Sequence, residues 1–201
     1  PLLFPLFLLS LCFGLWSSCK QPTQGSTQTP EEVSVILHKA DSLRKAGVFD
    51  TAITEYQKAL PLLRSQEDSL GRWINTQRFI SVMLSLELHR RAESLWNIEG
   101  AIDSLKNWKE PTSKNENREL ARLYLWEAFV SRQIGDNTRQ KVALERMEVI
   151  FRKYLYENYD IAWFLFSEMA NLYVRLGEFE NADRLFQESI EYEKKYKQQG
   201  I

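Results

Sequence analysis

The feature of the sequence that most restricts its fold is a pattern of six residues that occurs twice, beginning at positions 40 and 170. The first copy consists of Ala40, Gly47, Phe49, Ala52, Tyr56 and Ala59. The second copy, at the same spacings, consists of Ala170, Gly177, Phe179, Ala182, Phe186 and Ser189. Repetition on this scale is typical of folds in which one small unit is stacked on the next.

The segment that contains the repeats has the hydrophobic pattern of helices. Apolar residues recur at intervals of three and four, as in Val33, Ile36, Leu37 and Ala40, which places them on one helical face. Turn signals interrupt this pattern near residues 46–47, 69–71, 87–89, 110–115, 135–137, 158–160 and 177. The sequence therefore predicts an all-α fold of eight helices of about 15–20 residues, paired as hairpins.

The repeated pattern resembles the tetratricopeptide repeat (TPR). In that family, small residues such as Ala40 and Ala52 let two antiparallel helices cross closely. Gly47 takes the left-handed conformation that ends the first helix, and aromatic residues such as Tyr56 and Phe186 fill the gap against the next hairpin. The resemblance implies a right-handed α-solenoid of about four antiparallel hairpins over residues 31–201.

The two inner units match the pattern less closely. Ala92 and Trp96 reproduce the small-then-aromatic spacing of the first unit 40 residues later, which predicts that they lie at the corresponding buried positions of the second hairpin. In the third unit, Ala128 and Gly135 preserve the first-helix signature, and Gln140 stands at the expected small position of the second helix.

Residues 1–19 carry no charged side chain and consist mainly of Leu and Phe. The dense apolar run is shorter than the roughly 20 residues that a membrane-spanning helix needs, and it ends in small residues. These features are typical of a signal peptide. We expect residues 1–18 to be a signal peptide whose start is missing from the chain.

The end of this segment, Leu15-Trp16-Ser17-Ser18-Cys19, resembles the lipobox of bacterial lipoproteins. The resemblance implies that Cys19 carries a lipid anchor and that residues 19–30 form a flexible tether. Because Lys20 follows the cysteine, family analogy favours an outer-membrane lipoprotein that faces the periplasm. The alternative is an ordinary secretory signal cut near Ser18, with Cys19 as a free thiol.

The composition contains little that predicts chemistry. The 26 basic and 27 acidic side chains give a net charge of −1, without the basic excess of a nucleic-acid-binding domain. His38 and His89 stand alone, and no metal-binding, nucleophile or phosphate-loop motif occurs. The sequence predicts no catalytic residue, no metal site and no cofactor, and so a protein that is not an enzyme. Of the tryptophans at 73, 96, 108, 126 and 163, we expect most to fill the core.

The TPR resemblance implies a concave groove lined by the first helix of each hairpin. The predicted partner-binding residues are Arg44, Lys45, Arg132, Asn171 and Arg175. Other residues at groove positions are Asp41, Phe129, Gln133 and Val174, with Ser81, Leu84 and Ser85 from the second hairpin. Four basic residues on one face favour an acidic peptide as the partner. The alternative is that these are merely exposed polar positions.

Three functions remain open at this point. The first is a membrane-anchored, non-catalytic interaction module of the periplasm that binds a peptide or protein. The second is the N-terminal sensory or regulatory part of a longer protein, followed by a transmembrane helix and a DNA-binding or protease domain. The third is an outer-membrane assembly lipoprotein.

Overall fold

The computed structural model describes residues 30–155 and 159–198, and over these ranges the chain forms eight α-helices, two π-helical segments and no strand. The first four helical segments are α1 (Pro30–Lys45), α2 (Phe49–Arg64), α3 (Leu70–Val82) and η1 (Met83–Glu87). The rest are α4 (Arg91–Trp108), α5 (Lys114–Ile134), α6 (Asn137–Ile150), η2 (Phe151–Leu155), α7 (Tyr159–Leu176) and α8 (Phe179–Gln198). The predicted all-α class is confirmed, and every predicted break adjoins or separates helices.

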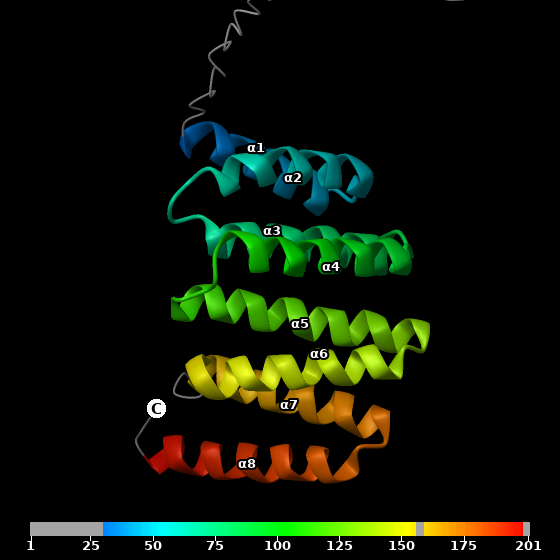
Figure 1. Ribbon diagram of the computed structural model, residues 1–201, viewed down its shortest axis with the longest axis vertical. Helices are drawn as coiled ribbons and strands as arrows, with labels where there is room; N and C mark the ends of the chain where they lie inside the picture. Colours follow the sequence, from blue (N-terminus) through cyan, green and yellow to red (C-terminus); the bar gives the residue numbers. More distant parts are fainter. Residues whose placement is uncertain (1–29, 156–158, 199–201) are drawn as a thin grey trace, which may run out of the picture.

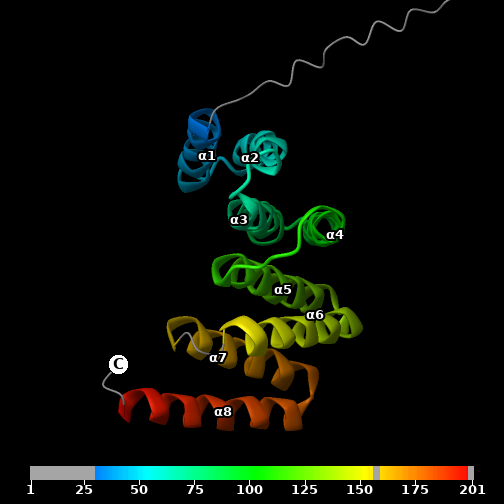
Figure 2. The same ribbon diagram turned by 60° about the vertical axis from the view of Figure 1, so that its left-hand side comes forward.

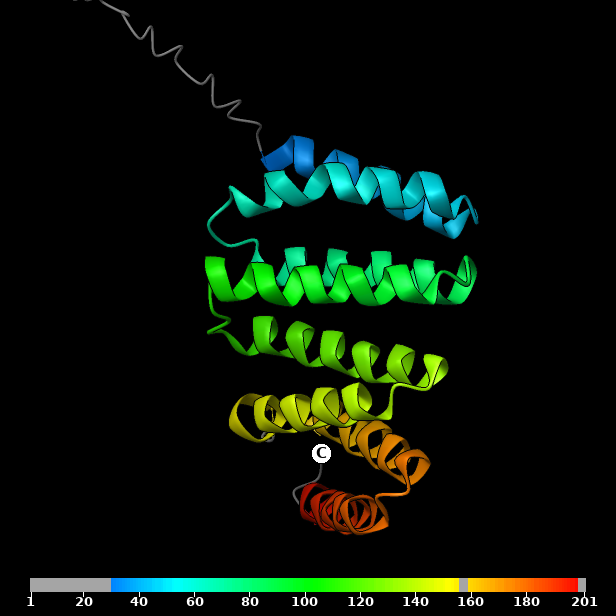
Figure 3. The ribbon, with the colours of Figure 1, turned by 45° about the vertical axis from the view of Figure 1, so that its right-hand side comes forward.

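Successive helices follow one another from α1 at one end of the molecule to α8 at the other (Figures 1 and 3). Helix α1 packs on α2, α3 on α4, α5 on α6 and α7 on α8, and α5 also contacts both α3 and α7. Among the first four helices, α1 and α3 lie on one side of the stack and α2 and α4 on the other (Figure 2). Helices α3, α5 and α7 are neighbours through the contacts of α5 with both of the others.

The predicted signal peptide (1–18), Cys19 and the predicted tether up to residue 29 lie outside the described residues. Within the described ranges, no helix combines the length and the apolar character that crossing a bilayer requires.

Three of the turns that join paired helices contain a glycine with positive φ, namely Gly47 (75°), Gly135 (82°) and Gly177 (77°). This confirms the conformation that the repeat predicts, since glycine adopts the left-handed region without a Cβ clash. At the turn between η1 and α4 the same conformation is taken by His89, with φ of 55°. It is the one non-glycine residue with positive φ in the described part of the chain.

An equivalent buried position follows each of these four turns at the same spacing. Five residues beyond the left-handed residue stand Ala52, Ser94, Gln140 and Ala182, all buried. The backbone N–H of each donates to the carbonyl oxygen four residues earlier, at the start of its helix. Gln140 is thus where the sequence predicts it, although it is not small.

The prediction for Ala92 and Trp96 is wrong. Ala92 is exposed and Trp96 is 67% exposed, whereas Ser94 and Ile98 are buried. The chain passes through the π-helical segment η1 and turns at His89, two residues later than a spacing of 40 from Gly47 would place the turn. This delay rotates α4, so that residues two positions further along point into the core.

Tyr56 and Phe186 occupy matching places in the repeat but different surroundings. Tyr56 is buried, and its ring stacks on Phe79 of α3 at a centroid distance of 6.0 Å, as predicted. Phe186 is 38% exposed, because no helix in the described part of the chain follows α8. Its predicted role against a next hairpin is therefore not tested within the described residues.

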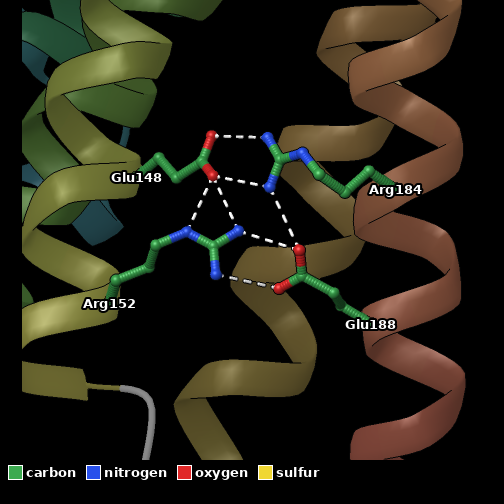
Figure 4. Close-up of polar contacts among 4 residues, drawn as sticks. All are labelled: Glu148, Arg152, Arg184 and Glu188. Atoms are coloured by element: carbon green, nitrogen blue, oxygen red, sulfur yellow. Dashed lines mark hydrogen bonds and ion pairs between the residues drawn. The ribbon is translucent and has the colours of Figure 1, made fainter.

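A network of four charged residues joins α6 and η2 to α8 (Figure 4). Arg184 donates to Glu148, and Arg152 donates to Glu188 through two nitrogens, each at 2.9 Å. Burial opposes the ionisation of Glu148, but hydrogen bonds from Arg184 and Arg152 outweigh it and lower the pKa of this carboxyl. The pKa of Glu188 is lowered by the same balance.

Candidate functional site

The first predicted groove residue, Arg44, is half-buried near the end of α1 and is engaged in contacts within the fold. Its Nε donates to the Tyr56 hydroxyl oxygen at 3.3 Å and its Nη2 to Asp41 at 3.2 Å. The Tyr56 hydroxyl itself donates to Asp41. Burial, followed by this hydrogen bond to Asp41, raises the pKa of Tyr56 to about 12. Arg44 therefore ties α1 to α2 and is only partly available to a partner.

The other predicted groove residues differ in how they are held. Arg132 is half-buried on α5, and its guanidinium lies 5.7 Å from the centre of the Phe129 ring. Its Nε has no hydrogen-bond partner within the described ranges. Lys45, Asn171 and Arg175 are exposed, with Lys45 in the last turn of α1 and Arg175 in the last turn of α7. Within the described part of the chain, no hydrogen bond or ion pair joins these three residues, so they do not by themselves form a compact site.

The groove positions predicted in the second hairpin are wrong. Ser81, Leu84 and Ser85 are buried, because their assignment depended on the incorrect register of Ala92. Ser81 instead holds α3 against α4: its backbone carbonyl accepts a hydrogen bond from Ser94 Oγ at 2.8 Å, and its hydroxyl accepts one from Asn97.

A pocket of about 500 Å³ opens where α3, α5 and α7 come together. Its apolar lining comes from Leu125, Trp126, Phe129 and Leu172, and its charged lining from Arg78, Arg122 and Glu168. The rings of Trp126 and Phe129 stack at a centroid distance of 4.9 Å, which gives the pocket a rigid aromatic wall. Pockets of this size with a few polar groups around an apolar lining are typical of ligand sites.

Arg78, at the α3 side of this pocket, has no ion pair in the described part of the chain. Its Nη2 donates to the neutral amide oxygen of Asn75 at 2.7 Å, and its Nε has no partner. Burial lowers the pKa of this guanidinium, but arginine stays charged at neutral pH. The guanidinium also lies 4.8 Å from the centre of the Phe79 ring, as does that of Arg44.

The carboxylate of Glu119 interacts with several arginines at this side of the pocket. Glu119 accepts hydrogen bonds from Arg118 at 3.0 Å and from Arg122 at 3.1 Å, both on the same oxygen. The charge of Glu119 also acts on Arg78. One buried carboxylate therefore faces three guanidiniums, and the α3–α5 edge of the pocket has an excess of positive charge.

A second pocket, of about 610 Å³, lies between α4, α5 and α6. Its charged residues largely neutralise one another: Arg139 bonds to Glu99 at 2.6 Å and to Glu127 at 3.0 Å, and Lys106 pairs with Asp103. Burial raises the pKa of Glu127. Because most of its charged side chains are already paired with one another, this pocket has fewer charged groups free to bind a ligand than the α3–α5–α7 pocket.

Sequence reasoning identified Phe129 in the better pocket but missed Arg78, Arg122 and Trp126. Arg78 precedes Ser81, the first predicted position of α3, and Arg122 and Trp126 precede Ala128 on α5, whereas the predicted positions of α5 all follow Ala128. A search in both directions along each first helix would have found them. The expectation that most tryptophans fill the core is confirmed for the described side chains, since Trp73 is buried, Trp108 and Trp126 are half-buried and pack against the core, and Trp96 alone of these four is exposed. The side chain of Trp163 lies outside the described part.

Within residues 30–155 and 159–198, no group of three or more His, Cys, Asp or Glu side chains is arranged to hold a metal ion. His38 and His89 are both exposed. Neither the models of known protein families nor the curated proteins contain a match to this chain.

Proposed function

We propose that the chain is a non-catalytic protein-binding module that receives a segment of a partner in the pocket between α3, α5 and α7. The observation that carries the proposal is the pocket itself, in which Leu125, Trp126, Phe129 and Leu172 surround about 500 Å³. Rigid aromatic residues in a pocket contribute much of the binding energy at protein interfaces. A large apolar side chain of a partner would fill this space, as in helix-in-groove recognition.

We further propose that the architecture is a TPR-like right-handed α-solenoid of four hairpins, with the pocket on its concave face. The left-handed turns at Gly47, Gly135 and Gly177 support this interpretation, as does the pairwise packing of α1 with α2 through α7 with α8. In such an array the first helices of successive hairpins line one surface, which agrees with a pocket lined from α3, α5 and α7.

The residues that line the pocket favour binding over catalysis. Its ionisable side chains are Arg78, Arg122 and Glu168, and its remaining lining residues are Leu, Trp and Phe. Glu168 is the one carboxylate among these described lining residues, and no histidine, cysteine or serine lies beside it there to form a catalytic pair.

Peptide selection tests the proposed binding site. A phage-displayed library of random peptides is selected on the purified protein, and the affinity of a selected peptide is measured by calorimetry for wild type and Trp126→Ala. We expect the substitution to weaken binding by about tenfold or more, since truncation of a central aromatic residue costs about 2 kcal/mol or more.

Trp96→Ala is the matched control, because Trp96 is 67% exposed on α4 and does not line the pocket. Its affinity for the selected peptide should equal that of wild type. If Trp126→Ala binds as tightly as wild type, the pocket is not the binding site.

We also propose that a lipid on Cys19 anchors the module at the outer membrane of a bacterial cell, facing the periplasm. The lipobox-like sequence ending in Cys19 and the polar segment that follows it support this proposal. A tether of this length reaches on the order of 20 Å. Cells are labelled with radioactive palmitate, and label should enter the wild-type protein but not Cys19→Ala. Equal labelling of the two proteins would refute the anchor.

A further inference from the structure

The charges around the α3–α5–α7 pocket are not spread evenly. Arg78 belongs to α3 and Arg122 to α5, and Glu119, whose charge acts on Arg78, already accepts hydrogen bonds from Arg118 and Arg122 on one oxygen. Glu168 belongs to α7 and has neither a hydrogen bond nor an ion pair in the part of the chain that the structure describes. The pocket thus has a cationic edge at α3 and α5 and an anionic group on α7.

A half-buried guanidinium without a counterion lowers the stability of the free protein, because burial removes part of its hydration. Arg78 is in this state, since its hydrogen-bond partner is the neutral Asn75 amide. A carboxylate supplied by a ligand would pair with Arg78 and with the face of Arg122 that Glu119 does not occupy. Charge-assisted hydrogen bonds of this kind are stronger than those between neutral groups.

The apolar part of the pocket comes mainly from one helix. Leu125, Trp126 and Phe129 all come from α5, the helix that contacts both α3 and α7. A ligand group that fills this part of the pocket would therefore have the two arginines toward α3 and Glu168 toward α7.

We infer that the pocket selects a partner segment in which an acidic residue, a large apolar residue and a basic residue follow one another, with Arg78 and Arg122 binding the acid and Glu168 the base. This inference rests on the proposed function, and it adds the class of sequence that the site recognises and the direction in which the segment lies. Arg78, Arg122 and Glu168 are then its specificity-determining residues. The predicted groove residues Lys45 and Arg175, which are exposed and do not line the pocket, are not.

A charge-exchange experiment tests the inference. A peptide selected on wild type is synthesised with its acidic residue intact and with that residue replaced by lysine, and both are measured against wild type and the double variant Arg78→Glu/Arg122→Glu. Wild type should bind the acidic peptide at least about tenfold more tightly than the lysine peptide, and the double variant should reverse this preference. Glu168→Lys should reverse the preference at the basic residue of the peptide in the same way.

Arg175→Glu is the control, since it changes charge on α7 without changing the pocket lining, and it should leave both affinities unchanged. Because the double variant places two new carboxylates near Glu119, which then keeps only Arg118 as a donor, Arg78→Gln/Arg122→Gln is measured beside it, and it should bind the two peptides equally. Circular dichroism confirms that each variant is folded.

The two levels of the proposal fail in different ways. If Trp126→Ala does not weaken binding of any selected peptide, the proposed function fails and this inference with it. If Trp126→Ala weakens binding, but the double variant and the glutamine variant keep the wild-type preference for the acidic peptide, the inference alone is overturned.

Discussion

Arg184 on α8 donates two hydrogen bonds to the carboxylate of Glu148 on α6, with distances of 2.8 and 3.1 Å between nitrogen and oxygen. The two residues are 36 positions apart in the chain, so their contact joins separate helices (Figure 4). We expect Arg184→Met to lower the free energy of unfolding by about 1–3 kcal/mol, because it leaves a mostly buried carboxylate with fewer donors. Chemical denaturation measures the change.

Lys106→Met is the control for this prediction. Lys106 and Asp103 form a pair within α4 in which both side chains are mostly exposed, and such pairs contribute about 0–1 kcal/mol. A loss in Lys106→Met as large as that in Arg184→Met would show that the network has no special importance.

The same network predicts how stability depends on pH. The pKa values of Glu148 and Glu188 lie below the ordinary value of 4.5 in the folded protein. A carboxyl of this kind stabilises the fold above its unfolded-state pKa, and the contribution is lost as the pH falls through the folded-state value. The difference in unfolding free energy between wild type and Glu148→Gln/Glu188→Gln should be constant between about pH 6 and pH 8 and should shrink below about pH 4.5. A difference that stays the same at low pH would contradict this assignment.

Substitutions at the left-handed turn residues Gly135 and His89 should change the unfolding free energy in opposite directions. Gly135→Ala should lower the unfolding free energy by about 1 kcal/mol, because a Cβ is unfavourable at positive φ. No heavy atom lies within 4 Å of that added Cβ, so the loss would come from the backbone and not from a clash. His89→Gly should raise the unfolding free energy by about 0.5–1 kcal/mol, since it relieves the same conformation.

Gly100→Ala provides the comparison for the turn residues. Gly100 lies inside α4 with open space around its Cβ position, so alanine there should stabilise the helix by about 0.5–1 kcal/mol. Thermal unfolding of the three variants separates the effect of φ from that of helix propensity. If Gly135→Ala stabilises the protein as Gly100→Ala does, the turn is not left-handed.

The register of α4 predicts different tolerance at two neighbouring positions. Ser94 is buried, and its hydroxyl donates to the carbonyl oxygen of Ser81 at 2.8 Å, whereas Ala92 is exposed. Ser94→Leu should lower the unfolding free energy by about 1–3 kcal/mol through overpacking, and Ala92→Leu should change it by less than about 0.5 kcal/mol. If Ala92→Leu lowered the unfolding free energy more than Ser94→Leu, the register predicted by a spacing of 40 residues would be correct instead.

The helical class and the element boundaries could be predicted because their signals are local. Apolar spacing identifies a helical face, and Gly47, Gly135 and Gly177 mark helix ends by a property of one residue, its freedom at positive φ. The second hairpin lacks such a mark. His89 takes the left-handed conformation after η1, and nothing local distinguishes it from Glu87, so the predicted register of α4 was wrong by two residues.

What the sequence by itself determined was which segments are helical, where most turns lie, and which small residues are buried in the two outer units. The tertiary structure alone decided which charges remain without partners. Arg44 bonds to Tyr56 and Asp41 while Arg78 has no carboxylate, although both are arginines on first helices beside the same Phe79 ring. The physical reason is that an ion pair depends on side chains brought together from helices dozens of residues apart. The pocket between α3, α5 and α7 exists only once those helices have packed.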